Sequence, residues 1–308
     1  MSESTQRQKI RQRNQLFTQI RGFFEARAVL EVDTPLLREF SVTDPYMSAF
    51  SVFSPSGSKK GYLQTSPEYA MKKLLSEDSG DIFQLSKMFR AEERSNIHLS
   101  EFTLLEWYRL GFDHNQLIQE VCEFIKYIVG YRDVAILDYK DCFLSLLSFD
   151  PHNISLDELA DKTRSLLGEL PDNLLRDNYL TLLFSEKIEP SFDRISITVV
   201  TNYPASQASL AKTRVKDGVE TADRFEIYLG GMELANGFNE LTDEKQQLIR
   251  FNADNEIRKQ LGYAEIEIDQ SFIQCLEKGL PDCAGVALGF DRLLMLKLGE
   301  ANIEKLVI

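Results

Sequence analysis

The chain of 308 residues lacks the sequence features of membrane proteins, of secreted proteins and of proteins stabilised by a structural metal site. No stretch approaches the roughly 20 consecutive apolar residues that a membrane-spanning helix needs. Residues 1–15 contain no apolar core of a secretory signal. The four cysteines are Cys122, Cys142, Cys275 and Cys283, and their spacing is not that of metal ligands. A chain of this size does not depend on disulfides. We therefore expect a cytoplasmic protein without a membrane span.

An excess of basic charge is also absent. The chain has 48 Asp and Glu against 35 Lys and Arg, a net charge of −13. A protein that grips nucleic acid over a wide surface normally presents a basic face, so the acidic balance argues against tRNA binding. No linker rich in Pro, Gly or Ser separates a second domain. We expect one large α+β domain over residues 1–308.

The residue patterns predict alternating helices and strands. Helices are expected over residues 6–27 and near 115–129, and the capping-box pair Ser155 and Glu158 predicts a helix start within a helical insertion over 150–190. The β-branched run 195–201 predicts a buried strand. Two more strands, 224–229 and 231–241, are expected around a glycine turn. His114 and His152 lack identifiable partners and are expected at the surface.

Two distant segments carry the chemistry. Residues 89–108 (FRAEERSNIHLSEFTLLEWY) predict a strand, a loop and a strand that gather the polar side chains Arg90, Glu92, Arg94 and His98 ahead of Phe102. Residues 285–293 (GVALGFDRL) predict a glycine-rich strand that runs into a helix carrying Arg292. Guanidinium forks suit phosphate oxygens, and an aromatic ring with an arginine over it suits a purine. Together the segments predict a clamp for a nucleoside triphosphate.

These segments resemble motifs 2 and 3 of the class II aminoacyl-tRNA synthetases, most closely those of the lysyl-tRNA synthetase branch. Residues 6–27 with VLEVDTPLL at 29–37 resemble motif 1, which builds the dimer interface in that family. The resemblance extends from about residue 6 to residue 300, with the motifs in the family's order. It implies the class II catalytic-domain fold, an antiparallel β-sheet flanked by helices, and a homodimer.

The resemblance also implies the residues of an ATP and Mg²⁺ site. Arg90 and Arg292 would be the catalytic arginines, with Arg90 at the α-phosphate and substrate carboxylate, and with adenine between Phe102 and Arg292. Arg94 and His98 would reach the terminal phosphates. The further ATP-binding positions implied are Ala91, Glu92, Leu99, Glu233, Leu234 and Gly289, and Glu226 and Glu233 match the metal-holding positions. The alternative is a surface hairpin with ordinary ion pairs, which contribute little.

The amino-acid pocket implied by the resemblance is acidic. Glu68, Glu240 and Tyr108 match positions that bind the two amino groups of lysine, and the remaining pocket positions are Ser66, Pro67, Asn236 and Ala287. Two carboxylates that converge on one pocket repel each other unless a cation lies there, so they favour a diamino substrate. Taken alone, Glu68 could equally be a carboxylate at a helix N-terminus, and Glu240 a solvated strand end.

Ala287 stands where the tRNA-charging relatives usually have glycine. One extra carbon in a filled pocket is worth ~1–3 kcal/mol of discrimination. We therefore expect Ala287 to favour a substrate with its amino group on the β-carbon, with plain strand packing as the alternative.

The lysyl-tRNA synthetases place an anticodon-binding domain ahead of motif 1, whereas here only a few residues precede that motif. The chain thus resembles the free-standing ligases that attach lysine or (R)-β-lysine to a lysine of elongation factor P. The expected function is ATP-dependent formation of the aminoacyl-adenylate and transfer to that protein. A truncated lysyl-tRNA synthetase, a non-catalytic regulatory paralogue and a ligase acting on small molecules remain alternatives.

Overall fold

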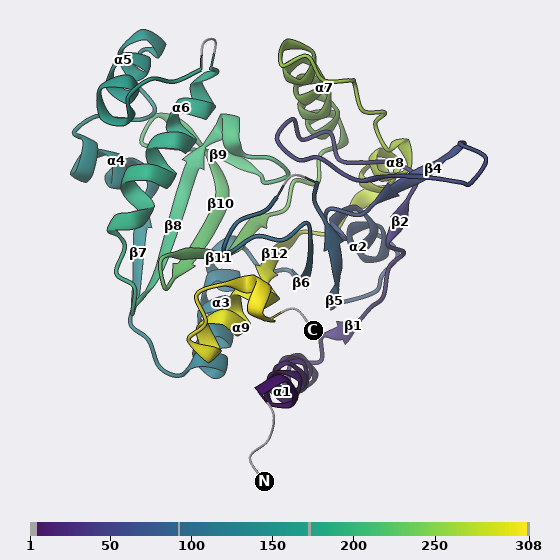
Figure 1. Ribbon diagram of the computed structural model, residues 1–308. Helices are drawn as coiled ribbons and strands as arrows, with labels where there is room; N and C mark the ends of the chain where they lie inside the picture. Colours follow the sequence, from purple (N-terminus) through teal and green to yellow (C-terminus); the bar gives the residue numbers. More distant parts are fainter. Residues whose placement is uncertain (1–4, 92, 172–173, 307–308) are drawn as a thin grey trace.

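The computed structural model describes residues 5–91, 93–171 and 174–306, and its centre is a nine-stranded sheet (Figure 1). The strands follow the order β1-β5-β6-β12-β11-β10-β8-β7, and β9 pairs with β10. Their bounds are β1 (Leu30–Glu31), β5 (Ile82–Phe89), β6 (Glu101–Leu110), β7 (Val134–Asp138), β8 (Ile197–Pro204), β9 (Thr213–Lys216), β10 (Val219–Leu229), β11 (Met232–Asn239) and β12 (Cys283–Gly289).

Most neighbouring strands run antiparallel, which confirms the predicted fold class, but the sheet is mixed. β1 pairs with β5 in parallel, and β7 pairs with β8 in parallel. Two parallel strands need a long crossover connection. The crossover between β7 and β8 consists of α4 (Tyr139–Leu147), α5 (Leu156–Leu167), α6 (Arg176–Leu183), η1 (Phe184–Ile188) and η2 (Glu189–Ser191). The helical insertion expected over 150–190 lies within it, and the predicted capping box opens α5 at Ser155.

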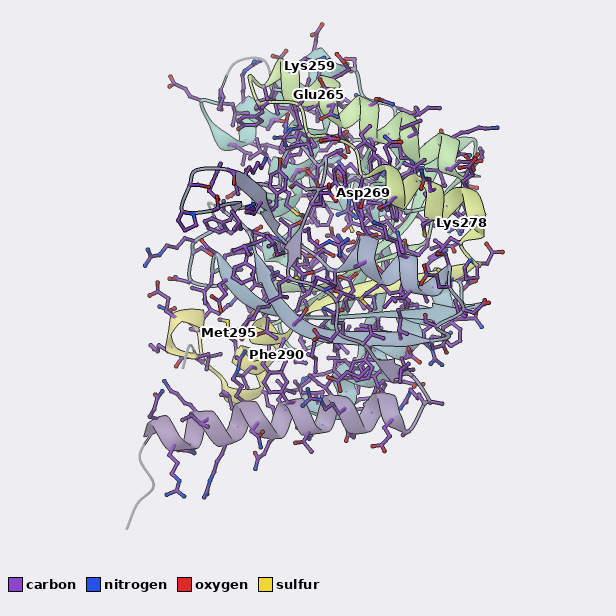
Figure 2. All side chains as sticks on the ribbon, turned by 90° about the vertical axis from the view of Figure 1, so that its right-hand side faces the viewer. Lys259, Glu265, Asp269, Lys278, Phe290 and Met295 are labelled. Carbon is purple, nitrogen blue, oxygen red and sulfur yellow. The ribbon has the colours of Figure 1, made fainter. Side chains whose placement is uncertain are left out.

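One face of the large sheet is covered by α1 (Thr5–Glu25), α3 (His114–Val129) and α9 (Phe290–Leu298). Strand alternation sends Leu105 and Trp107 of β6 into this core. Figure 2 shows α1 along the base of the molecule, with Phe290 and Met295 of α9 above it. No helix of the described ranges combines the length and apolar character needed to cross a membrane.

The opposite face of the sheet is covered at two ends. The crossover helices pack over β8 and β10, on the left of Figure 1. Three other helices pack near β5, β6 and β12, on the right; they are α2 (Glu68–Leu75), α7 (Glu244–Gln260) and α8 (Gln270–Gly279). Alternate residues of a strand point to opposite faces of a sheet. Along β6, β10 and β12, every second side chain therefore packs toward α1 and α3, and the others point to this opposite face. Between the two helical groups this face bears the cavity described below.

A second, three-stranded sheet contains β2 (Leu37–Arg38), β4 (Lys59–Leu63) and β3 (Ser51–Phe53), in that order. The segment 29–37, which resembles part of motif 1, is therefore divided: β1 joins the large sheet and β2 joins the small one. Pro35 lies between them and has no N–H to donate to a strand ladder.

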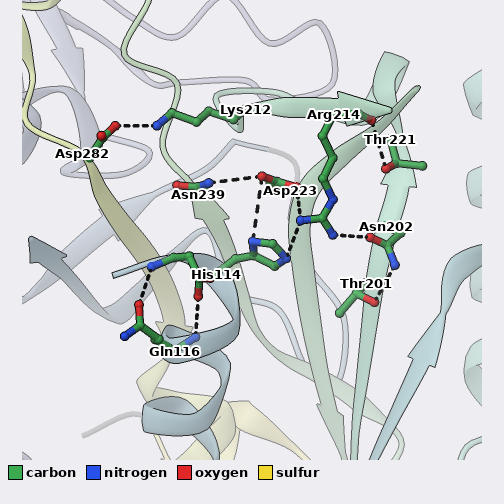
Figure 3. A network of polar contacts seen from close by, with 11 residues as sticks. His114, Gln116, Thr201, Asn202, Lys212, Arg214, Thr221, Asp223, Asn239 and Asp282 are labelled. Carbon is green, nitrogen blue, oxygen red and sulfur yellow. Dashed lines mark hydrogen bonds and ion pairs between the residues drawn. The ribbon is translucent and has the colours of Figure 1, made fainter. Parts of the chain in front are cut away.

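The expectation for His114 is wrong, because this residue is 3% exposed at the start of α3 (Figure 3). Its Nδ1 lies 4.0 Å from Asp223 Oδ2, and its Nε2 lies 3.5 Å from Arg214 Nη1. Arg214 also donates to Asn202 at 2.9 Å, so the cluster fastens the start of α3 to β8, β9 and β10. Burial lowers the pKa of His114. His152 is half-buried rather than exposed.

Candidate active site

A cavity of about 410 Å³ opens on the large sheet between the two helical groups. Most residues that the sequence assigned to substrate, ATP and metal line it. They are Ser66, Glu68, Arg90, His98, Leu99, Phe102, Tyr108, Glu226, Glu233, Leu234, Asn236, Glu240, Ala287, Gly289 and Arg292. They come from segments far apart in the chain that only the tertiary structure brings together.

The other assigned residues are placed differently. Pro67 is the N-cap of α2, and Ala91 donates its N–H to the Ser48 carbonyl at 2.8 Å, but neither is among the described lining residues. The Arg94 side chain is 80% exposed and pairs with Glu304 at 3.2 Å. The structure therefore does not bring Arg94 to the cavity. Glu92 lies outside the described residues.

Strand register divides the cavity into two ends. On β6, Phe102 and Tyr108 lie six positions apart, which corresponds to ~20 Å along a strand. Tyr108 pairs with Gly285 of β12, whereas Gly289 pairs with Leu104, near Phe102. The residues near Phe102 and those near Tyr108 are therefore described separately.

At the Phe102 end the cavity is cationic and aromatic. The guanidinium carbon of Arg90 lies 5.1 Å from the Phe102 ring centre. Arg90 Nε donates to the Thr65 carbonyl at 3.3 Å, and Nη1 lies 3.4 Å from Glu93 Oε1. These contacts orient the guanidinium beside the ring. An aromatic face next to a guanidinium fork suits a purine and its phosphates.

His98 holds the second arginine of this end. Arg292 Nη2 lies 2.5 Å from His98 Nε2, and the Ser95 hydroxyl lies 2.8 Å from His98 Nδ1. Because a guanidinium only donates, Nε2 is the acceptor and the ring proton lies on Nδ1. Burial, followed by the charge of Arg292, lowers the pKa of His98, so the imidazole is neutral near pH 7. Arg292 Nη1 also donates to the Glu233 carbonyl at 2.7 Å.

The cavity wall at this end is fastened to α1. Asp291 Oδ1 accepts from Arg13 Nη1 at 2.6 Å, and its Oδ2 accepts from the Thr103 N–H at 2.6 Å. Arg13 lies 4.7 Å from the Phe290 ring centre. One carboxylate thus joins α1, β6 and α9 beside this end of the cavity.

At the Tyr108 end the cavity is acidic. Glu68, Glu106 and Glu240 line it together with Tyr108. Glu106 Oε1 accepts from the Tyr108 hydroxyl at 2.7 Å, and Oε2 accepts from the Ser66 hydroxyl at 2.9 Å. Burial, with the charge of Glu68, raises the pKa of Glu106 to about 8. Three carboxylates in one pocket make it a site for positively charged groups.

One cation is already present beside these carboxylates. Lys72 lies one helical turn after Glu68 on α2, and its side chain is 0% exposed. Its Nζ lies 2.7 Å from Glu68 Oε1 and 2.5 Å from Glu240 Oε2. Burial alone would lower the pKa of Lys72, but the charges of Glu240 and Glu68 outweigh it and raise the pKa. The ammonium therefore stays charged.

Only glycine fits at position 285 of β12. A Cβ there would lie 2.3 Å from Tyr108 Cε1 and 2.4 Å from Glu240 Oε1. Tyr108 and Glu240 therefore meet over the bare backbone of Gly285.

The two expected metal ligands lie on neighbouring strands and line the cavity. Glu226 Oε2 accepts from the hydroxyls of Tyr203 and Tyr228, while among the described residues Oε1 accepts from Arg224 Nη2 alone, at 2.5 Å. Oε1 thus keeps acceptor capacity. Burial raises the pKa of Glu233, and the charge of Glu226 adds to the rise, a strain that a bound cation would relieve.

These two carboxylates fit Mg²⁺, which usually takes one or two carboxylates together with substrate phosphates. Within the described ranges, no group of three or more His, Cys, Asp or Glu residues is placed to hold a metal by protein ligands alone.

Sequence reasoning missed three residues of the site. Glu106 had a usable signal, because strand alternation puts it on the same face as Tyr108. Lys72 also had one, since helical spacing i, i+4 puts it beside Glu68. Arg224 lines the cavity and donates to Glu226, Asn236 and the Gln207 carbonyl, and no local pattern marks it.

Known proteins resemble this chain along nearly its whole length. Residues 1–308 match the family model of tRNA synthetases class II (D, K and N). The chain is 44% identical over 304 residues to an elongation factor P–(R)-β-lysine ligase of Histophilus somni (strain 2336), covering 97% of this chain and 94% of that protein. It is 45% identical over 305 residues to the protein of the same name from Vibrio cholerae, covering 96% and 93%. The chain therefore belongs to the class II tRNA synthetases (D, K and N) and, within them, to the family of the elongation factor P–(R)-β-lysine ligases.

Proposed function

We propose that this protein activates (R)-β-lysine or lysine with ATP and transfers the aminoacyl group to a lysine side chain of elongation factor P. The observation that carries the proposal is the two-ended cavity. Its Phe102 end has an aromatic ring and two arginines, and its Tyr108 end has three carboxylates. A nucleotide and a diamino acid therefore fit side by side in one site.

In the first step an oxygen of the substrate carboxylate attacks the α-phosphorus of ATP. A bond forms between that oxygen and phosphorus, and the bond from phosphorus to pyrophosphate breaks. Two anions must approach, so fixed positive charge lowers the barrier more than an acid or base would. Arg90 meets the reacting groups, and Arg292 stacks on adenine opposite Phe102. Magnesium held by Glu226 and Glu233 would supply further charge neutralisation at the phosphates.

At the Tyr108 end the protein selects the amino acid. Ammonium groups of the substrate would pair with Glu68, Glu106 and Glu240, with the Tyr108 hydroxyl as a neutral partner. Ala287 pairs with Glu106 on one side and with Asn236 on the other. Its methyl group therefore lies between a carboxylate and an amide that line the pocket, where one carbon affects the position of the substrate amino group.

In the second step the acceptor amine attacks the acyl carbon, an amide bond forms and AMP leaves as the amine loses a proton. The acceptor is proposed from the relatives, whose names specify elongation factor P. Charging of tRNA is less favoured, because the relatives reported above are named for elongation factor P and the chain is acidic. The intact phosphate-handling arginines disfavour a non-catalytic paralogue.

The proposal includes a homodimer in the cytoplasm. Large apolar side chains are exposed around β1 to β3, with Leu30 58%, Leu37 48% and Phe53 59% exposed. Burial of such a surface favours self-association. The four cysteines are free and buried, in keeping with a reducing compartment. Light scattering on the purified protein measures the oligomeric state, and a monomer at micromolar concentration would contradict this part.

The main test is ATP–pyrophosphate exchange with (R)-β-lysine, α-lysine or aspartate, followed by transfer assays with elongation factor P and with tRNA. We expect exchange with a lysine isomer but not with aspartate, and transfer to the protein but not to tRNA. Transfer to tRNA alone would replace the proposal by a tRNA-charging enzyme. Absence of exchange with every amino acid would refute catalysis.

A further inference from the structure

Lys72 pairs with two carboxylates of the acidic pocket, although binding of a diamino substrate does not by itself require a lysine of the protein there. The two ammonium groups of such a substrate would be expected to neutralise the pocket carboxylates. Instead the protein inserts a cation of its own, and its Nζ touches Glu68 and Glu240 at 2.7 and 2.5 Å. Removing this lysine would leave the carboxylates of Glu68 and Glu240, 17% and 1% exposed, without this counter-charge.

Lys72 lies behind the carboxylates and does not take the place of the substrate. Glu68 and Glu240 line the cavity, whereas Lys72 is absent from the lining among the described residues. Its side chain is 0% exposed, and that of Glu240 is 1% exposed. The helix that carries Lys72 is itself anchored, since Ala70, Met71 and Leu75 are buried. A substrate in the cavity therefore meets the carboxylates of Glu68 and Glu240 from one side, while Lys72 pairs with them from the other.

The charges of the pocket can be counted from these contacts. Glu68, Glu106 and Glu240 supply three carboxylates, and Lys72 supplies one ammonium. With all three carboxylates ionised, two negative charges are left, which matches the two ammonium groups of a lysine isomer. In the empty pocket burial raises the pKa of Glu106 and of Glu240 to about 8, so the arriving ammonium groups complete the ionisation. Without Lys72, Glu68 and Glu240 would share a proton and turn toward each other, as close carboxylates do.

We propose that Lys72 is a built-in counter-ion that pairs with Glu68 and Glu240 and holds their carboxyl groups in place, so that the pocket accepts substrates with two ammonium groups. The proposal deepens the proposed function and rests on it. Lys72 is a positioning residue, because it acts through the two glutamates rather than on the reacting atoms.

The test compares Lys72→Met, which keeps the length of the side chain but removes its charge, with Lys72→Arg, which keeps the charge. Lys73→Met is the matched control, because Lys73 is on the same helix and binds Asp269 and Ser271 instead. ATP–pyrophosphate exchange gives KM for the lysine isomer and for ATP separately. We expect Lys72→Met to raise the amino-acid KM at least tenfold with the ATP KM within about twofold, and Lys72→Arg to retain more affinity than Lys72→Met.

A second measurement separates charge from packing. In Lys72→Ala the side chain leaves a space that propylammonium can fill, and 1-propanol is a neutral molecule of similar size. We expect propylammonium, but not propanol, to lower the amino-acid KM of Lys72→Ala, and neither to improve the wild-type enzyme or Lys73→Met. An unchanged KM in Lys72→Met, or equal rescue by both molecules, would overturn the inference while leaving the proposed function intact. A wild-type enzyme without lysine-dependent exchange would overturn both.

Discussion

Replacing Glu106 by glutamine would make the protein more stable and less able to bind its amino acid. Glu106 is 2% exposed and accepts hydrogen bonds from Tyr108 and Ser66. Its pKa is raised from 4.5 to about 8, so the unfolded chain loses a proton in this pH range that the folded protein keeps. The unfolded state binds fewer protons there, and stability therefore falls as the pH rises from about 4.5 to about 8.

Glutamine does not titrate and so removes this dependence. Each unit of pKa shift corresponds to about 1.4 kcal/mol, and we expect a stabilisation of about 1–3 kcal/mol near neutral pH. At about 2–4 °C per kcal/mol, the melting temperature would rise by several degrees. The gain would be near zero at pH 4.5 and largest near pH 8.

The same substitution removes a carboxyl group that a substrate ammonium would ionise and bind, and a hydrogen bond to a charged group is worth about 1.5–3 kcal/mol. The amino-acid KM should rise roughly ten- to hundredfold, with the ATP KM unchanged. Thermal unfolding across this pH range and exchange kinetics measure the two effects. Glu123→Gln is the control, since the Glu123 side chain is 65% exposed. A Glu106→Gln protein that melts no higher than the wild type near pH 8, or that keeps its amino-acid KM, would refute the reasoning.

Three further substitutions test other parts of the cavity. Gly285→Ala places a Cβ 2.3 Å from Tyr108 Cε1, and overpacking of this kind destabilises a protein by roughly 1–3 kcal/mol or more. Lysine-dependent exchange should fall by about a hundredfold or more, because Tyr108 and Glu240 would be displaced. Gly22→Ala is its control, because a Cβ on this residue of α1 meets no atom within 4 Å, and equal losses in both would contradict the steric argument. Phe102→Ala should raise the ATP KM about tenfold and leave the amino-acid KM unchanged, as stacking on a base contributes about 1–3 kcal/mol; a raised amino-acid KM instead would assign the ring to the other substrate. Ala287→Gly should shift the preference between α-lysine and (R)-β-lysine by ~1–3 kcal/mol, measured as the ratio of kcat/KM values, and an unchanged ratio would remove Ala287 from selection.

Several elements followed from short stretches of sequence, because the interactions that form them are local. The capping box at Ser155 opens α5 through hydrogen bonds between residues three positions apart. The alternation along β6 sends Leu105 and Trp107 to the core, and Glu106 and Tyr108 to the cavity. Such patterns are set by the geometry of a strand or a helix turn and do not depend on the rest of the fold.

The resemblance to class II synthetases carried the prediction further than local patterns do. It assigned Arg90, Phe102 and Arg292 to ATP, and these residues line one cavity although Phe102 and Arg292 are far apart in the chain. It also assigned Arg94, whose side chain points to solvent and pairs with Glu304. Motif matching identifies positions, but the direction of a loop side chain depends on neighbours such as Glu304 that lie outside the motif.

The sequence by itself determined the class of chemistry: arginines and an aromatic ring for a nucleotide, and carboxylates for a basic amino acid. Only the tertiary structure decided the charge state of that pocket, because it brings Lys72 of α2 against Glu240, which follows β11, and buries both. The same holds for His114, whose partners Arg214 and Asp223 are about a hundred residues away in the chain. Coulombic and desolvation energies depend on distances across the fold, and these distances cannot be read from spacing along the chain.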